Sequence, residues 1–145
     1  SWQGKTVESW NDVIEALYAR YHLPVLANEW GYSSGGAVKE EKPDPALLPE
    51  GIPDVCYEKS WFHSAEGGHT EAVQAEYLRR GLQIFAENPH VLGSFLFCFQ
   101  DARHCYHCGA SDCPSECYWG IVDVEGKPKQ AYTAVKQAIR DYYTK

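Results

Sequence analysis

The sequence predicts an α/β fold in which the strands run parallel. Amphipathic stretches, with apolar residues three and four positions apart, alternate with two short apolar runs, PVLA and VLGSFLFCF. Continuously apolar runs are typical of strands buried on both faces, and their alternation with helices is typical of parallel βαβ units. The chain has 145 residues, enough for one domain with a hydrophobic core.

The first predicted elements are a helix over residues 6–21 and a short strand over residues 25–27. Thr6 is the expected N-cap, because its hydroxyl can accept a hydrogen bond from the first turn. Pro24 prevents the helix from continuing. The apolar face of the helix comprises Val7, Trp10, Ile14, Leu17, Tyr18 and Tyr21.

Residues 31–69 show no period, and a loop of this length in a compact domain is usually functional. It contains the aromatic cluster Trp61-Phe62-His63, which either shapes a site or packs internally. A second helix is predicted over residues 70–87 and a second strand over residues 91–99. A cysteine-rich loop, 102–118, follows, and Pro128 is the expected first residue of the last helix.

Two parallel strands are too few for a stable sheet, since their open edges and apolar faces need neighbours. A (β/α)8 barrel takes about 250 residues. We therefore expect residues 1–145 to be part of a larger fold, completed by the N-terminal portion of a barrel or by a second chain.

The net charge argues against some partners. Thirteen basic and twenty acidic residues give a formal charge of −7, and no basic stripe is available for a phosphate backbone. The apolar runs are shorter than a membrane span. We expect neither nucleic acid nor a membrane as a partner.

Both predicted strands end on polar residues, Asn28-Glu29 and Gln100-Asp101. In parallel α/β folds the carboxyl ends of the strands form the active-site mouth. A glutamate there can act as a nucleophile or a general base, and Trp30 can supply a flat apolar wall. The alternative is that Glu29 caps a helix or pairs with an arginine.

Three segments in order resemble a known family. PVLANEWGY resembles the seventh-strand motif of retaining clan-A (β/α)8 glycoside hydrolases. HTEAVQAEYLRRGLQIFAENPHVLGSFLFCFQDAR resembles their seventh helix and eighth strand, and WGIVDVEGKPKQAYTAVKQAIRDYY resembles the closing segment. The set is most similar to the C-terminal barrel portion of family 2, the group of β-galactosidases, β-glucuronidases and β-mannosidases.

The resemblance implies a retaining hydrolase of terminal β-glycosides that needs no catalytic cofactor. Glu29 matches the nucleophile that forms a covalent glycosyl-enzyme, and a second carboxyl is required about 5–5.5 Å away. In this family that carboxyl belongs to a fourth-strand Asn-Glu pair. The sole Asn-Glu here is Asn28-Glu29, so the partner must lie outside the chain, and the chain alone is expected to be inactive.

The same resemblance places four residues on the substrate side: Asn28, Trp30, Phe97 and Asp101. Phe97 stands where the family often has a tryptophan. Because of this difference, the resemblance does not define which sugar the site would bind. Asp101 is equally compatible with a structural role. Because the acid/base carboxyl is missing, the alternative function is a non-catalytic carbohydrate-binding or scaffold subunit.

Four cysteines lie close together in the second loop: Cys105, Cys108, Cys113 and Cys117. Thiolates at this spacing can bind one tetrahedral Zn²⁺. Two disulfides are one alternative and free thiols are another. Disulfides would indicate an extracellular protein, and without them the sequence does not define the location. Either the zinc site or the disulfides would stiffen one wall of the mouth. A small zinc-stabilised interaction module is a third functional hypothesis. Cys98 is expected to be buried in a strand, and Cys56 is unassigned.

Overall fold

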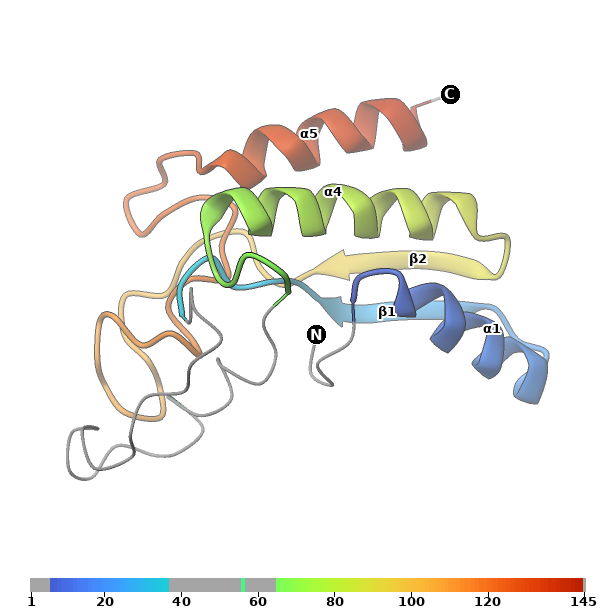
Figure 1. The fold of residues 1–145 in the computed structure, drawn as a ribbon, viewed down its shortest axis with the longest axis horizontal. Coiled ribbons are helices and arrows are strands. Elements are labelled where there is room, and N and C mark those ends of the chain that lie inside the picture. Colours follow the sequence, from blue (N-terminus) through green and yellow to red (C-terminus); the bar gives the residue numbers. More distant parts are fainter. Residues whose placement is uncertain (1–5, 37–55, 57–64, 145) are drawn as a thin grey trace.

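A computed structural model describes residues 6–36, 56 and 65–144. The chain order is α1 (Ser9–Tyr21), β1 (Val25–Trp30), α4 (Glu71–Glu87), β2 (Val91–Leu96) and α5 (Gln130–Tyr143) (Figure 1). The predicted α/β class is confirmed. Much of the long loop predicted over residues 31–69, including the Trp61-Phe62-His63 cluster, lies outside the described residues.

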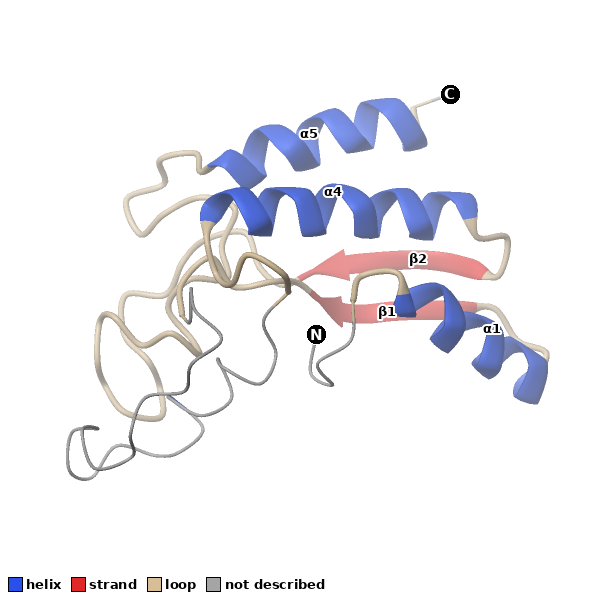
Figure 2. Cartoon of the chain, in the orientation of Figure 1, coloured by secondary structure: helices blue, strands red, loops and turns tan. Residues whose placement is uncertain are grey.

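The two strands form a parallel sheet with α4 as the connection between them. Val25 is paired with Val91 and Trp30 with Leu96. Both arrows in Figure 2 point the same way, toward the loops that follow the strands. The carboxyl ends of β1 and β2 therefore lie at the same edge, as parallel pairing requires.

Most element boundaries differ from the prediction by a few residues. Helix α1 begins at Ser9, and the Thr6 carbonyl accepts a hydrogen bond from the Ser9 N–H at 3.1 Å, so Thr6 is not the N-cap. Thr70 does cap α4, because its Oγ1 accepts from the Val73 N–H at 3.2 Å. Strand β1 continues to Trp30, beyond the apolar run, whereas β2 ends earlier than expected.

The core lies between the sheet and the helices. Helix α4 runs alongside the strands and α5 lies next to α4 (Figure 1). Trp10 of α1 and Trp30 of β1 both make edge-to-face contacts with Phe85 of α4, with centroid distances of 5.3 and 4.8 Å. The buried members from α4 and α5 are Tyr77, Leu78, Leu82, Phe85, Ala131, Val135 and Ala138.

The strands also carry large apolar side chains that the described residues do not cover. Leu92 is 72% exposed and Phe95 is 62% exposed, and Leu26 is also exposed. One side of the sheet is thus packed against helices. The apolar side chains on its other side are not covered by any of the described residues. None of the described helices has the length and apolar character needed to cross a lipid bilayer.

Candidate active site

The candidate site lies at the carboxyl ends of β1 and β2. Asn28 and Glu29 are exposed near the end of β1, and Phe97 directly follows β2. The Phe97 N–H donates to the Trp30 carbonyl at 2.8 Å, so the chain segments that carry Glu29 and Phe97 are held together. The Phe97 ring contacts Trp119 at a centroid distance of 5.9 Å.

Gly31 permits this close approach. A Cβ at position 31 would clash with the carbonyl oxygen of Phe97 and would also crowd the Trp119 ring. Because backbone atoms cannot move aside as a flexible side chain can, a larger residue would separate the two strand ends. The glycine in the sequence Asn-Glu-Trp-Gly is therefore part of the geometry that positions Glu29.

A second carboxylate, Glu116 of the cysteine-rich loop, lies within electrostatic range of Glu29. Burial raises the pKa of the Glu116 carboxyl, His107 opposes this, and the negative charge of Glu29 adds to it. His107 Nε2 and Glu116 Oε1 are 3.9 Å apart. Sequence reasoning missed Glu116 and His107, because no local pattern relates this loop to Glu29.

The structure corrects the expected role of Trp30. Its side chain is only 4% exposed and packs against Phe85 and over Gly81 of α4. The strand pairing is irregular between Ala27 and Trp30, so that Asn28 and Glu29 are both exposed and Trp30 is buried. Trp30 thus belongs to the core and does not form the expected wall for the sugar.

Asp101 makes internal contacts, which favour the structural one of its two expected roles. Its two carboxylate oxygens accept hydrogen bonds from Lys129 Nζ at 3.0 and 3.1 Å, and Oδ1 accepts from the Gly120 N–H at 2.7 Å. Burial raises the pKa of the Asp101 carboxyl, and the Lys129 ammonium opposes that shift. This buried pair closes the base of the cysteine-rich loop by joining the segment that follows β2 to the N-cap residue of α5.

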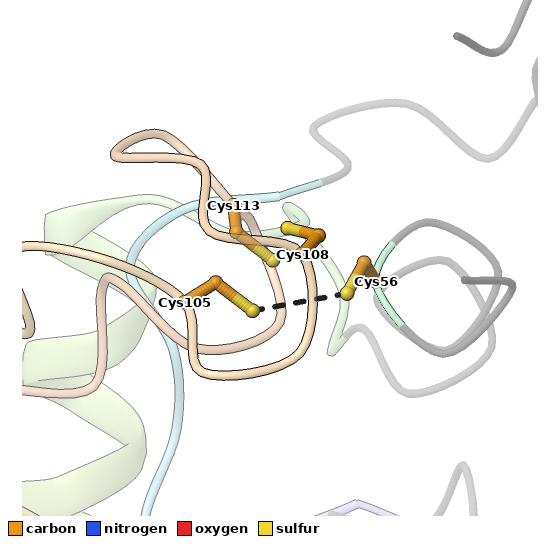
Figure 3. A group of neighbouring side chains, drawn as sticks. All are labelled: Cys56, Cys105, Cys108 and Cys113. Atoms are coloured by element: carbon orange, nitrogen blue, oxygen red, sulfur yellow. Dashed lines mark hydrogen bonds between the residues drawn. The ribbon is translucent and has the colours of Figure 1, made fainter. Parts of the chain in front are cut away.

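Four thiols converge at this loop: Cys105, Cys108 and Cys113 of the loop itself, and Cys56 (Figure 3). Their sulfur atoms all lie within 4.8 Å of one another, and the Cys56 and Cys105 sulfurs are 3.8 Å apart. This arrangement is able to hold a metal ion. All six cysteines are free, so the disulfide alternative is not found.

The membership of the cluster differs from the sequence expectation, because Cys56 replaces Cys117. The Cys117 N–H donates to the Cys113 carbonyl at 3.0 Å, and its thiol turns back to the Ala110 carbonyl at 3.5 Å. Cys56 lies 49 positions before Cys105, so spacing gave no signal for it. Cys98, expected to be buried in a strand, lies just beyond β2 and is half-buried.

The thiols of the cluster differ in their ease of ionisation. Burial raises the pKa of Cys113 to about 12, and burial also raises the pKa of Cys56. Burial acts on Cys105 in the same direction, but the backbone N–H groups of Cys108 and His107 outweigh it and lower the pKa of that thiol. The backbone around Cys105 therefore favours the thiolate form of that side chain.

Comparisons with known proteins bear on the fold. No protein family and no curated protein sequence matches the chain. Solved structures do match it. A GH2 β-galacturonidase from Eisenbergiella tayi, bound to galacturonate, is 22% identical with a TM-score of 0.59, over 94% of this chain and 21% of that one.

Two further matches are similar in extent. The β-glucuronidase of Faecalibacterium prausnitzii is 18% identical with a TM-score of 0.60, over 93% of this chain and 18% of that one. GH5_18 from Streptomyces cattleya, in complex with GlcNAc, is 17% identical with a TM-score of 0.58, over 96% of this chain and 26% of that one.

These likenesses show a shared fold. The matched structures include β-glycosidases of the group that the sequence motifs resemble. The chain spans about a fifth of the length of the GH2 β-galacturonidase, so the activity of such a protein is not transferred to this chain by the likeness alone.

Proposed function

We propose that this chain supplies the nucleophile of a retaining glycoside hydrolase that cleaves terminal β-glycosides. The observation that carries the proposal is the position of Glu29. It is an exposed carboxylate at the carboxyl end of a parallel strand, next to Phe97, in a chain whose fold matches β-glycosidase structures. Active sites of parallel α/β folds lie at this edge.

In the proposed reaction an oxygen of the Glu29 carboxylate bonds to the anomeric carbon as the glycosidic bond breaks. A second carboxyl group gives its proton to the leaving oxygen and later removes one from the water that releases the sugar. The anomeric configuration is retained because the carbon is attacked twice. Asn28 can hydrogen-bond to a sugar hydroxyl, and Phe97 can cover an apolar face of the ring. These steps need no cofactor.

The second carboxyl belongs, in this proposal, to the rest of a (β/α)8 barrel or to a second chain. Residues 1–145 would then be the part of the barrel with about the seventh and eighth strands. The exposed Leu26, Leu92 and Phe95 support this, because apolar side chains on parallel strands need further strands or helices to cover them.

The proposal is tested on the complete protein with aryl β-glycosides, including glucuronides and galacturonides because of the enzymes named above. Glu29→Gln should lower kcat by about 10³-fold or more, since a missing nucleophile disables the whole catalytic unit. Glu116→Gln is the matched control, with a change of about 10-fold or less expected, because it removes a neighbouring charge and no bond-forming group.

A covalent probe tests the same role directly. A 2-deoxy-2-fluoro glycoside with a good leaving group should accumulate as an ester on Glu29, to be located by mass spectrometry of peptides. An ester on another residue, or full turnover by Glu29→Gln, would refute the assignment.

The alternative is a carbohydrate-binding or scaffold subunit without catalysis. It is favoured by one observation, that Asn28-Glu29 is the sole Asn-Glu pair in the chain. Calorimetry that detects binding of a sugar by the complete protein, together with no hydrolysis of any aryl glycoside, would support this alternative.

A further inference from the structure

We propose that Cys56, Cys105, Cys108 and Cys113 bind one structural Zn²⁺, which fixes position 56 to the cysteine-rich loop beside Glu29. The inference goes beyond the glycosidase proposal and does not depend on it. It rests on the positions of the four sulfur atoms and on the backbone that presents them.

The spacing of the sulfurs suits a tetrahedral ion. With Zn–S bonds of about 2.3 Å, ideal tetrahedral geometry puts the sulfurs about 3.8 Å from one another. The Cys56 and Cys105 sulfurs are 3.8 Å apart, and all pairs lie within 4.8 Å. A disulfide would require about 2.05 Å. A small contraction of the longer pairs would complete four-coordinate geometry.

The backbone around Cys105 has the shape of a metal-binding turn. The Cys105 N–H donates to the Ala110 carbonyl at 2.9 Å, and the Gly109 N–H donates to the Cys105 carbonyl at 2.8 Å. Gly109 has a φ of 74°, a conformation that glycine adopts without strain. Within this turn the His107 N–H points at the Cys105 sulfur at 3.3 Å, as a donor to a thiolate would.

The surroundings favour a closed structural site. Cys56, Cys105 and Cys113 are buried and Cys108 is half-buried, and together with Cys117 they pack as a small group apart from the main core. Four thiolates select Zn²⁺ or iron among the common metals, and four protein ligands leave no position open for water. A catalytic role for the ion is therefore not part of the proposal.

The ion would hold the loop in place. Cys105, Cys108 and Cys113 lie within the segment that carries Glu116, whose carboxyl pKa is raised in part by the charge of Glu29, and His107, 3.9 Å from Glu116. Because a structural metal contributes its binding free energy to folding, its loss should loosen this wall of the candidate site before it unfolds the α4–α5 core.

The first test is metal analysis of the complete protein, purified under reducing conditions without chelator. About one zinc per chain is expected for a closed four-cysteine site. Cys56→Ser should lose the zinc. Cys117→Ser is the matched control, since Cys117 is equally buried but outside the cluster, and it should keep the zinc. Stoichiometric iron, zinc retained by Cys56→Ser, or equal loss in both variants would overturn the proposal.

A second test needs no variant. Thiol alkylation of the wild-type protein, read by mass spectrometry, should leave the four cysteines unmodified until a strong zinc chelator is added, whereas Cys98 should react under both conditions. Alkylation of Cys56 before chelation would count against the site. Neither the metal content nor the alkylation pattern depends on hydrolysis. A negative result for zinc therefore leaves the glycosidase proposal intact, and a negative result for hydrolysis leaves the zinc proposal intact.

Discussion

The buried ion pair between Asp101 and Lys129 allows a quantitative test of how the cysteine-rich loop is anchored. The two side chains are 7% and 5% exposed, and the ammonium contacts both carboxylate oxygens. Lys129→Met keeps the apolar length of the side chain and removes the charge. The Asp101 carboxylate is then left in a desolvated position, where the Gly120 N–H still donates to its Oδ1 at 2.7 Å.

Breaking a buried pair by removing one partner costs about 3–5 kcal/mol, chiefly because the remaining charge is uncompensated. With a urea m-value of about 2 kcal/mol/M, the unfolding midpoint should fall by roughly 2 M. The measurement is urea unfolding of the complete protein, followed by tryptophan fluorescence, with the m-value checked for constancy.

An exposed pair in the same region gives the matched control. Arg103 and Glu125 are 65% and 66% exposed, and their charged atoms are 3.4 Å apart. Surface pairs contribute about 0–1 kcal/mol, so Arg103→Met should shift the midpoint by less than about 0.5 M. If the two variants had the same midpoint, the reasoning from burial would be wrong. Combining Lys129→Met with Asp101→Asn should recover part of the loss, because the second change removes the unpaired charge.

Two further predictions concern packing and pH. Gly81→Ala should destabilise the protein by about 1–3 kcal/mol, because the new Cβ would clash with the Trp30 ring. Gly93→Ala has room, with the nearest atom at 3.6 Å, and should be close to neutral in the same unfolding assay. Hydrogen bonds from Asn88, and then His90, lower the pKa of Glu15 below its usual 4.5. Its contribution to stability is therefore present above about pH 4.5 and is lost as the pH falls through the lower folded-state pKa. In Glu15→Gln the acid-induced decrease in stability should be smaller, and an unchanged pH profile would contradict this.

The sequence by itself determined the secondary structure and the edge at which a site can form. The helical period, the apolar runs and Pro24 are local properties, and they predicted α1, β1, α4 and β2 to within a few residues. The continuously apolar strands also indicated parallel pairing, which in turn brought the ends of both strands to one edge.

Tertiary structure alone decided which residues at that edge are available for chemistry. Trp30 was expected on the substrate side, but its contacts with Phe85 and Gly81 of α4 place it in the core. For Asp101 the sequence left a substrate-side and a structural role open, and its ion pair with a lysine 28 positions later favours the structural one. Sequence patterns report local periodicity, whereas these outcomes depend on which side of the sheet the helices cover and on contacts between distant segments.

The cysteines show the same division most clearly. Their types and spacing predicted a metal site, since thiolates are suited to Zn²⁺ wherever they gather. Spacing favoured the near neighbour Cys117, but the turn of backbone after Cys113 directs that thiol to Ala110, and Cys56 enters from the distant loop. The sequence thus determined the chemistry of the cluster. Only the fold decided its members, because local composition does not indicate that a cysteine 49 positions before Cys105 joins it.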